Sequence, residues 1–96
     1  MKILFNPEKD YENCPLKVGE TYTLVRAIRY CTNEDIEDLQ INPNIFKINP
    51  WGDLWLPAGT MMTYVGNNYN GWPTFVIGNE EVDFACDQDI VLEEVK

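Results

Sequence analysis

Apolar and polar residues alternate over several short stretches of this chain, and turn residues end each stretch after a few positions. The clearest case is residues 21–28, where Tyr22 and Leu24 fall on one side and Thr23 falls on the other. Successive side chains of a β-strand point to opposite faces, so this repeat is typical of a strand with one buried face. Turn residues such as Gly78 allow the chain to reverse between strands. The pattern predicts a mostly β domain.

A chain of 96 residues has the size of one small domain, so we expect residues 1–96 to form a single domain. Leu24, Tyr64 and Phe84 fall at inward positions and are expected in its core. Residues 29–59 are expected as an insertion between the second and third strands. The strand-like stretches are 3–5, 21–28, 60–65, 73–77, 82–86 and 90–95, and about five short antiparallel strands are predicted among them.

The insertion carries its own local signals. Asn33 is a candidate helix N-cap, acidic residues follow it, and Ile36 and Leu39 have the spacing of one helix face. One short helical turn is therefore predicted there. Prolines interrupt the rest, so residues 40–57 are expected as an insertion loop or an irregular strand. Their many apolar side chains must cover a barrel mouth or contact a partner.

The order of several short motifs resembles that of Src-homology-3-like (SH3-like) barrels. The motifs are Phe5, the acidic loop Asp10-Tyr11-Glu12, the turn Leu16-Lys17-Val18-Gly19-Glu20 before a strand, and the closing strands after Gly71-Trp72-Pro73. This topological resemblance implies a small SH3-like barrel of about five antiparallel strands with one short helical turn and a long insertion loop.

Charge is distributed unevenly along the chain. The formal net charge is −9, and the segment from Ile48 to Val95 contains no Lys or Arg. Binding to nucleic-acid phosphates or to anionic lipid requires clusters of basic residues, so neither is expected. The charge fits a cationic partner. The alternative is that the acidity only keeps a small protein soluble.

Acidic and aromatic residues of the second half are the candidate partner-binding residues, because carboxylates pair with Arg or Lys and aromatic rings stack on them. Trp72 is expected to be a partly exposed anchor, whereas Trp55 is expected to cap the core. The candidate set is Trp51, Tyr69, Trp72, Glu80, Glu81, Asp83, Asp87 and Asp89.

Catalytic chemistry is not indicated. The chain has no histidine, which removes the most common general base and metal ligand. Cys14, Cys31 and Cys86 are widely spaced and are expected to be structural thiols in a reducing cytosol. The acidic stretches lack the glycine and the spacing of a calcium loop, and Gly66-x-x-x-x-Gly71 lacks the Lys of a phosphate loop. We expect no catalytic residues, no metal site and no cofactor.

These observations predict a non-enzymatic cytoplasmic protein that occludes a basic, nucleic-acid-binding surface of another protein. Its small size and acidity resemble those of small phage-encoded anti-defence proteins, among them DNA mimics and anti-CRISPR inhibitors. Neither a targeting segment nor a membrane span is visible. One alternative is a pocket for a small ligand beneath the loop tryptophans. Others are a reader of Lys- or Arg-containing peptides and an accessory subunit held by residues 40–57.

Overall fold

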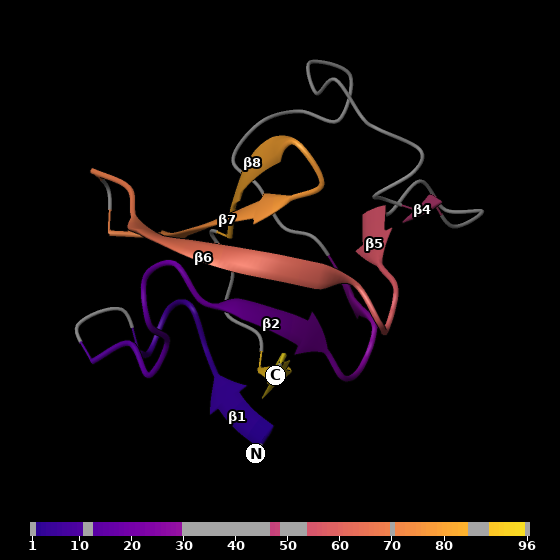
Figure 1. The fold of residues 1–96 in the computed structure, drawn as a ribbon, viewed down its shortest axis with the longest axis horizontal. Coiled ribbons are helices and arrows are strands. Elements are labelled where there is room, and N and C mark those ends of the chain that lie inside the picture. The colour runs from indigo at the N-terminus through magenta and orange to yellow at the C-terminus, as the bar shows by residue number, and fades with distance from the viewer. Residues whose placement is uncertain are drawn as a thin grey trace.

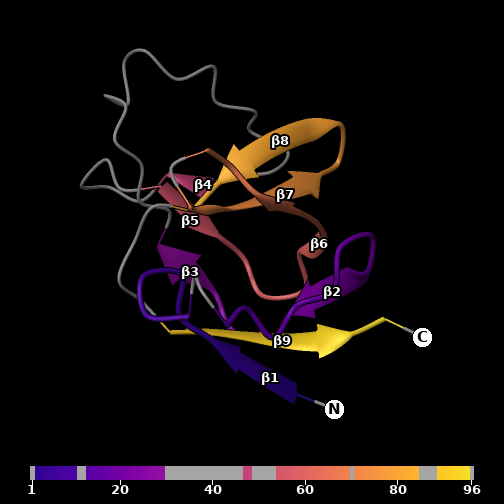
Figure 2. The ribbon, with the colours of Figure 1, turned by 90° about the vertical axis from the view of Figure 1, so that its left-hand side faces the viewer.

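The computed structural model describes residues 2–10, 13–29, 47–48, 54–69, 71–84 and 89–95, and every regular element in these ranges is a β-strand. Six of the strands form one antiparallel sheet in the order β1-β9-β2-β6-β7-β8 (Figures 1 and 2). Their bounds are β1 Lys2–Phe5, β2 Thr21–Leu24, β6 Met61–Asn67, β7 Pro73–Ile77, β8 Glu80–Asp83 and β9 Ile90–Glu94. The prediction of a mostly β domain is confirmed.

A second, three-stranded sheet is built mainly from the predicted insertion. Strand β5 (Leu54–Leu56) lies between β3 (Ile28–Arg29) and β4 (Lys47–Ile48), and both pairings are antiparallel. Leu54 and Leu56 are buried and join the same core as the large sheet. Residues 47–48 and 54–56 are therefore strands, one of the two alternatives expected for residues 40–57, whereas the predicted helical turn after Asn33 lies outside the described residues.

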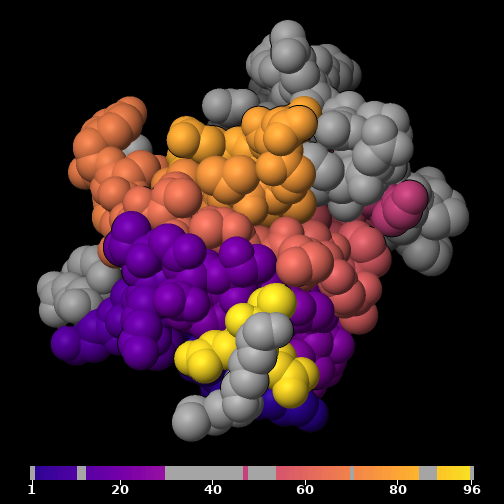
Figure 3. All heavy atoms as spheres, viewed as in Figure 1, coloured from indigo at the N-terminus to yellow at the C-terminus, as the bar shows by residue number. Residues whose placement is uncertain are grey.

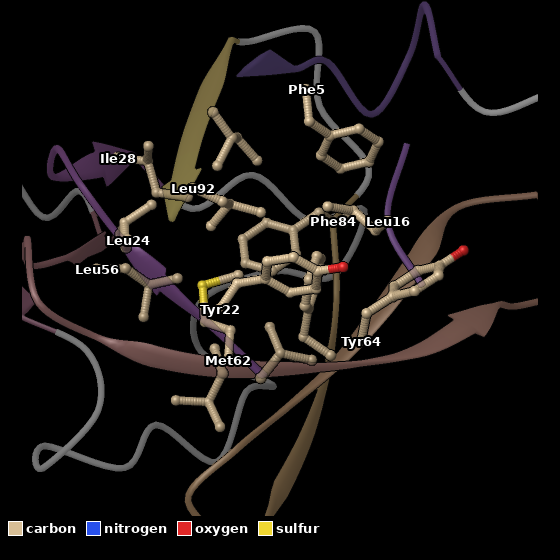
Figure 4. Close-up of a cluster of buried hydrophobic side chains, with 14 of the residues drawn as sticks. Phe5, Leu16, Tyr22, Leu24, Ile28, Leu56, Met62, Tyr64, Phe84 and Leu92 are labelled. Atoms are coloured by element: carbon tan, nitrogen blue, oxygen red, sulfur yellow. The ribbon is translucent and has the colours of Figure 1, made fainter. Parts of the chain in front are cut away.

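The buried hydrophobic residues of both sheets form one core (Figure 4). Phe5 of β1, Tyr22 of β2 and Leu92 of β9 lie in one cluster with Phe84, which follows β8. Phe84 packs edge-on against Phe75, with 5.3 Å between the ring centroids. The predicted inward positions of Leu24, Tyr64 and Phe84 are confirmed, since all three are buried.

The predicted strand over residues 21–28 is divided between the two sheets. Leu24, the last residue of β2, donates its N–H to Thr60 and accepts from Gly59, both on the β6 side. The chain then leaves the large sheet and re-enters regular structure as β3. In the described part of the chain, β1 and β8 end the strand order and do not pair with each other, so the large sheet is open there.

Tyr64 is buried in this core, but its hydroxyl points out of the cluster of apolar side chains and donates to Asn67 Oδ1 at 2.6 Å (Figure 4). Burial raises the pKa of the Tyr64 hydroxyl above its ordinary value of 10.0, and the neighbouring Cys14 side chain raises it further. Folding therefore favours the neutral hydroxyl.

A pH dependence of stability follows from this pKa shift. As the pH rises past about 10, the Tyr64 hydroxyl ionises in the unfolded chain while it stays protonated in the folded one. Below that pH the ionisation of Tyr64 should not change the free energy of unfolding. Above it the free energy of unfolding should fall, by at most about 1.4 kcal/mol per pH unit. Urea titrations of the protein and of Tyr64→Phe test this, because the variant should lose stability less steeply. Identical slopes would contradict the assignment.

Candidate partner-binding surface

The structure separates the predicted partner-binding residues into groups. Tyr69 and Trp72 lie in the turn between β6 and β7, Glu80, Glu81 and Asp83 lie on β8, and Asp89 directly precedes β9. Trp51 and Asp87 lie outside the described residues. The turn and β8 belong to one continuous stretch of structure, because β7 links them (Figure 1).

The register of the β7–β8 hairpin decides which acids share a face. Gly78 and Asn79 connect the strands, and Gly78 has a φ of 64°, the backbone of a tight hairpin turn that begins with glycine. Residues directly opposite each other in a sheet lie on the same face. Glu81 and Asp83 are exposed and pair with the half-buried Val76 and the buried Thr74, whereas Glu80 pairs with the buried Ile77.

Only two of the three β8 acids therefore form a common surface. Glu81 lies opposite Val76 and Asp83 lies opposite Thr74, and these pairs share the face of the hairpin that does not carry the buried Ile77. Glu80 is half-buried on the other face. We define the outer edge of β8 as Glu81 and Asp83 together. In Figure 3 the hairpin (orange) lies at the surface, on the side of the molecule away from β1 and β9.

A hydrogen bond orients one of these carboxylates. The Thr74 hydroxyl donates to Asp83 Oδ1 at 2.5 Å, and Thr74 itself is 9% exposed. This contact holds the Asp83 side chain against β7 while the residue stays exposed. A carboxylate has further lone pairs that accept hydrogen bonds, so Asp83 retains the capacity to pair with a cation.

The turn between β6 and β7 projects from the body of the molecule (Figures 1 and 3). Asn68 holds it together: its N–H donates to the Trp72 carbonyl at 2.8 Å, and its side-chain Oδ1 accepts the Trp72 N–H at 3.0 Å. Gly71 supplies the positive φ value of the turn and Gly66 has another at the irregularity within β6, and no described residue other than glycine has a positive φ. Asparagine therefore contributes hydrogen bonds there, and glycine the backbone reversal.

The two aromatic residues of this turn differ in exposure. Tyr69 is 97% exposed, whereas Trp72 is half-buried directly before β7. Because Thr74 pairs with Asp83, Trp72 and Asp83 lie at the same end of the β7–β8 hairpin. The structure thus places two aromatic residues on the β6–β7 turn and two exposed carboxylates on β8, which β7 connects to that turn.

Separate stability and binding effects are expected at these two aromatics. Replacing Tyr69 with Ala should change the free energy of unfolding by less than about 0.5 kcal/mol, because its side chain packs on almost nothing. Replacing Trp72 with Ala should weaken partner binding by about 2 kcal/mol or more, as truncation of an aromatic anchor does. Thermal melts and partner affinities of the two single variants check this. A Trp72 variant that binds normally would place the binding surface elsewhere.

Asp89 lies apart from these residues, near the end of β1. Asn6 donates from Nδ2 to Asp89 Oδ1 at 3.1 Å, and the Asn6 Oδ1 accepts the backbone N–H groups of Glu8 and Lys9 at 3.0 and 3.1 Å. Asp89 thus stabilises the loop after β1. Since β1 and β9 stand at the opposite end of the strand order from β8, Asp89 does not join the outer edge of β8.

Trp55 does not occupy the position expected from the sequence. Its neighbours Leu54 and Leu56 are buried in the core, so Trp55 faces the other side of the small sheet and is half-buried. Arg29 and Lys47 are its cross-strand partners on either side. Sequence reasoning missed this basic-aromatic row because its members come from stretches that only the sheet pairing brings together.

No group of three or more His, Cys, Asp or Glu side chains among the described residues is arranged to hold a metal ion. Among the same residues no helix has the length and apolar character needed to cross a bilayer. Comparison with known proteins shows that no family model, no curated protein and no solved structure matches this chain.

Proposed function

We propose that this chain is a non-enzymatic binding protein that occludes a basic, nucleic-acid-binding surface of a partner protein. The observation that carries the proposal is the placement of Glu81 and Asp83, both exposed on the same face of β8, which ends the strand order of the large sheet. Tyr69 and Trp72 on the adjoining turn add aromatic surface. The carboxylates take the place of phosphates, and the aromatics provide the desolvated contacts.

The physical chemistry of the surface favours Arg- or Lys-rich partners. A carboxylate accepts two parallel hydrogen bonds from an arginine side chain. A cation–π contact between the same side chain and an aromatic face contributes about 0.5 to 2 kcal/mol. The net charge of −9 steers a basic partner toward the molecule over distances comparable to the Debye length. A nucleic-acid-binding protein has the complementary surface.

Three finer assignments belong to the same proposal. The domain is an SH3-like barrel, supported by its short antiparallel strands around one core. The protein acts in the cytoplasm, supported by its odd number of widely spaced cysteines. Its role is that of a phage anti-defence inhibitor, supported by its small size and acidity.

Affinity capture at two salt concentrations tests the proposed function. The immobilised protein should retain a basic nucleic-acid-binding protein from host lysate at low salt, release it at high salt, and block its binding to DNA or RNA. The control is a variant with Glu81 and Asp83 both changed to Lys, which should retain much less of it. Retention that is insensitive to salt and to these two changes would contradict the proposal.

A further inference from the structure

The backbone of β8 offers hydrogen-bonding groups at the edge of the large sheet. In a tight antiparallel hairpin the pair that flanks the turn exchanges two hydrogen bonds, and every second pair along the strands does the same. Ile77 and Glu80 flank the turn, so Glu80, Val82 and Phe84 direct their backbone groups toward β7. The hydrogen bond from the Phe84 N–H to the Pro73 carbonyl, at 3.0 Å, agrees with this alternation along the strand.

The intervening residues are therefore the ones whose backbone points away from the sheet. Glu81 and Asp83 direct their N–H and C=O groups outward, and no described strand lies beyond β8. Their side chains are also exposed. The same two residues thus combine an open row of donors and acceptors with two negative charges.

The opposite edge of the sheet has a different character. The Val91 carbonyl accepts from Val25, and the Val95 N–H donates to Thr21, so the odd-numbered residues of β9 face β2. The even-numbered residues must then face β1, which leaves the backbone groups of Leu4 directed outward. Leu4 is 62% exposed and its neighbour on that edge is Lys2. The β1 edge is apolar and basic, and the β8 edge is acidic.

We propose that β8 binds an extended basic segment of a partner as an additional strand of the large sheet. Strand addition uses backbone hydrogen bonds for affinity and alternate side chains for specificity. A segment with Lys or Arg at every second position places its cations on the face that carries Glu81 and Asp83. Charge on an edge strand also opposes pairing with neutral strands and with a second acidic edge, so the acids select a cationic occupant.

This inference rests on the proposed function and specifies how the basic partner is held. The probe is an acetylated peptide of four Lys-Thr repeats, and the control peptide has Gln in place of each Lys. Binding is measured by fluorescence polarisation at low and high salt. The protein should bind the Lys peptide at low salt and should bind the Gln peptide at least ~10-fold more weakly.

Proline variants separate backbone pairing from charge. Glu81→Pro removes an outward N–H and leaves the bonds to β7 intact, as proline on an edge strand does. It should bind the Lys peptide at least ~10-fold more weakly than Glu81→Gln, which loses only the charge. Leu4→Pro makes the equivalent change on the β1 edge and should bind like the unaltered protein. Circular dichroism confirms that each variant is folded.

Amide hydrogen exchange on the unaltered protein provides a measurement that does not depend on the variants. The Lys peptide should slow exchange at the Glu81 and Asp83 amides at least ~10-fold and should leave the Leu4 amide unchanged. Protection at Leu4 instead would overturn the inference, because the peptide would then add to β1. Concentration-dependent protection of Leu4 and Glu81 without peptide would overturn it in favour of pairing between two copies.

The outcomes also distinguish this inference from the proposed function. If Glu81→Pro and Glu81→Gln bind the Lys peptide equally and Glu81 gains no protection, strand addition is wrong and the acidic surface still binds cations. The same holds if the peptide does not bind while a basic protein is captured in a salt-dependent way. Failure of both the peptide and the capture experiment would overturn both proposals.

Discussion

Replacing Phe84 with Ala is expected to lower the free energy of unfolding by about 3 to 5 kcal/mol, the usual cost of truncating a buried aromatic residue. Phe84 is 0% exposed and lies with its ring 5.3 Å from that of Phe75. It also anchors the end of β8 through its N–H bond to Pro73. The change leaves a cavity at the point where the chain leaves the edge of the large sheet.

Chemical denaturation of the variant measures this effect, with Tyr69→Ala as the control because Tyr69 is 97% exposed. The stability of a small domain is about 5 to 15 kcal/mol, so the Phe84 variant should lose a large part of it. Phe84→Leu should cost less, since most of the volume is kept. A loss below about 1 kcal/mol for Phe84→Ala would mean that Phe84 does not hold the core together.

The second large effect is expected on association with the partner. Reversing both Glu81 and Asp83 to Lys should slow binding at least ~10-fold at low salt, because electrostatic complementarity acts mainly on the association rate. The difference from the unaltered protein should shrink as salt rises, since the Debye length falls from about 8 Å at physiological salt to about 3 Å at 1 M. Folding should be retained because both side chains are exposed.

A matched control separates local charge from net charge. Glu8 and Glu20 are exposed outside the strands, and their reversal to Lys changes the net charge by the same amount. Stopped-flow association rates should fall much further for the β8 variant than for the Glu8 and Glu20 variant. Equal rates in the two variants would show that only the total charge matters, and the outer edge of β8 would lose its special role.

Much of the large sheet was predictable because side-chain alternation is a local signal. The expected strand 73–77 coincides with β7, and the expected strand 90–95 matches β9 to within one residue. The alternation of Val82 and Phe84 predicts a strand over 82–86, but the strand of the structure, β8, begins two residues earlier. Strand β8 begins at Glu80, immediately after the Gly78-Asn79 turn, since the hairpin pair closes there.

Features that depend on pairing between distant segments could not be predicted. The alternation over residues 21–28 gives no sign that the strand divides between two sheets. Similarly, the sequence suggests one acidic cluster formed by Glu80, Glu81 and Asp83. The hairpin register shows instead that Glu80 lies on the other face. The hydrogen bond from Asn6 to Asp89 likewise depends on contact between residues near the two ends of the chain.

The outer edge of β8 is proposed to take the place of nucleic acid on a basic partner. The most direct measurement is a competition titration in which the captured partner, bound to labelled DNA or RNA, is mixed with increasing amounts of this protein. Full displacement of the nucleic acid is expected, with the Glu81 and Asp83 reversal variant requiring at least ~10-fold more protein. A stable ternary complex of partner, nucleic acid and this protein would contradict the account.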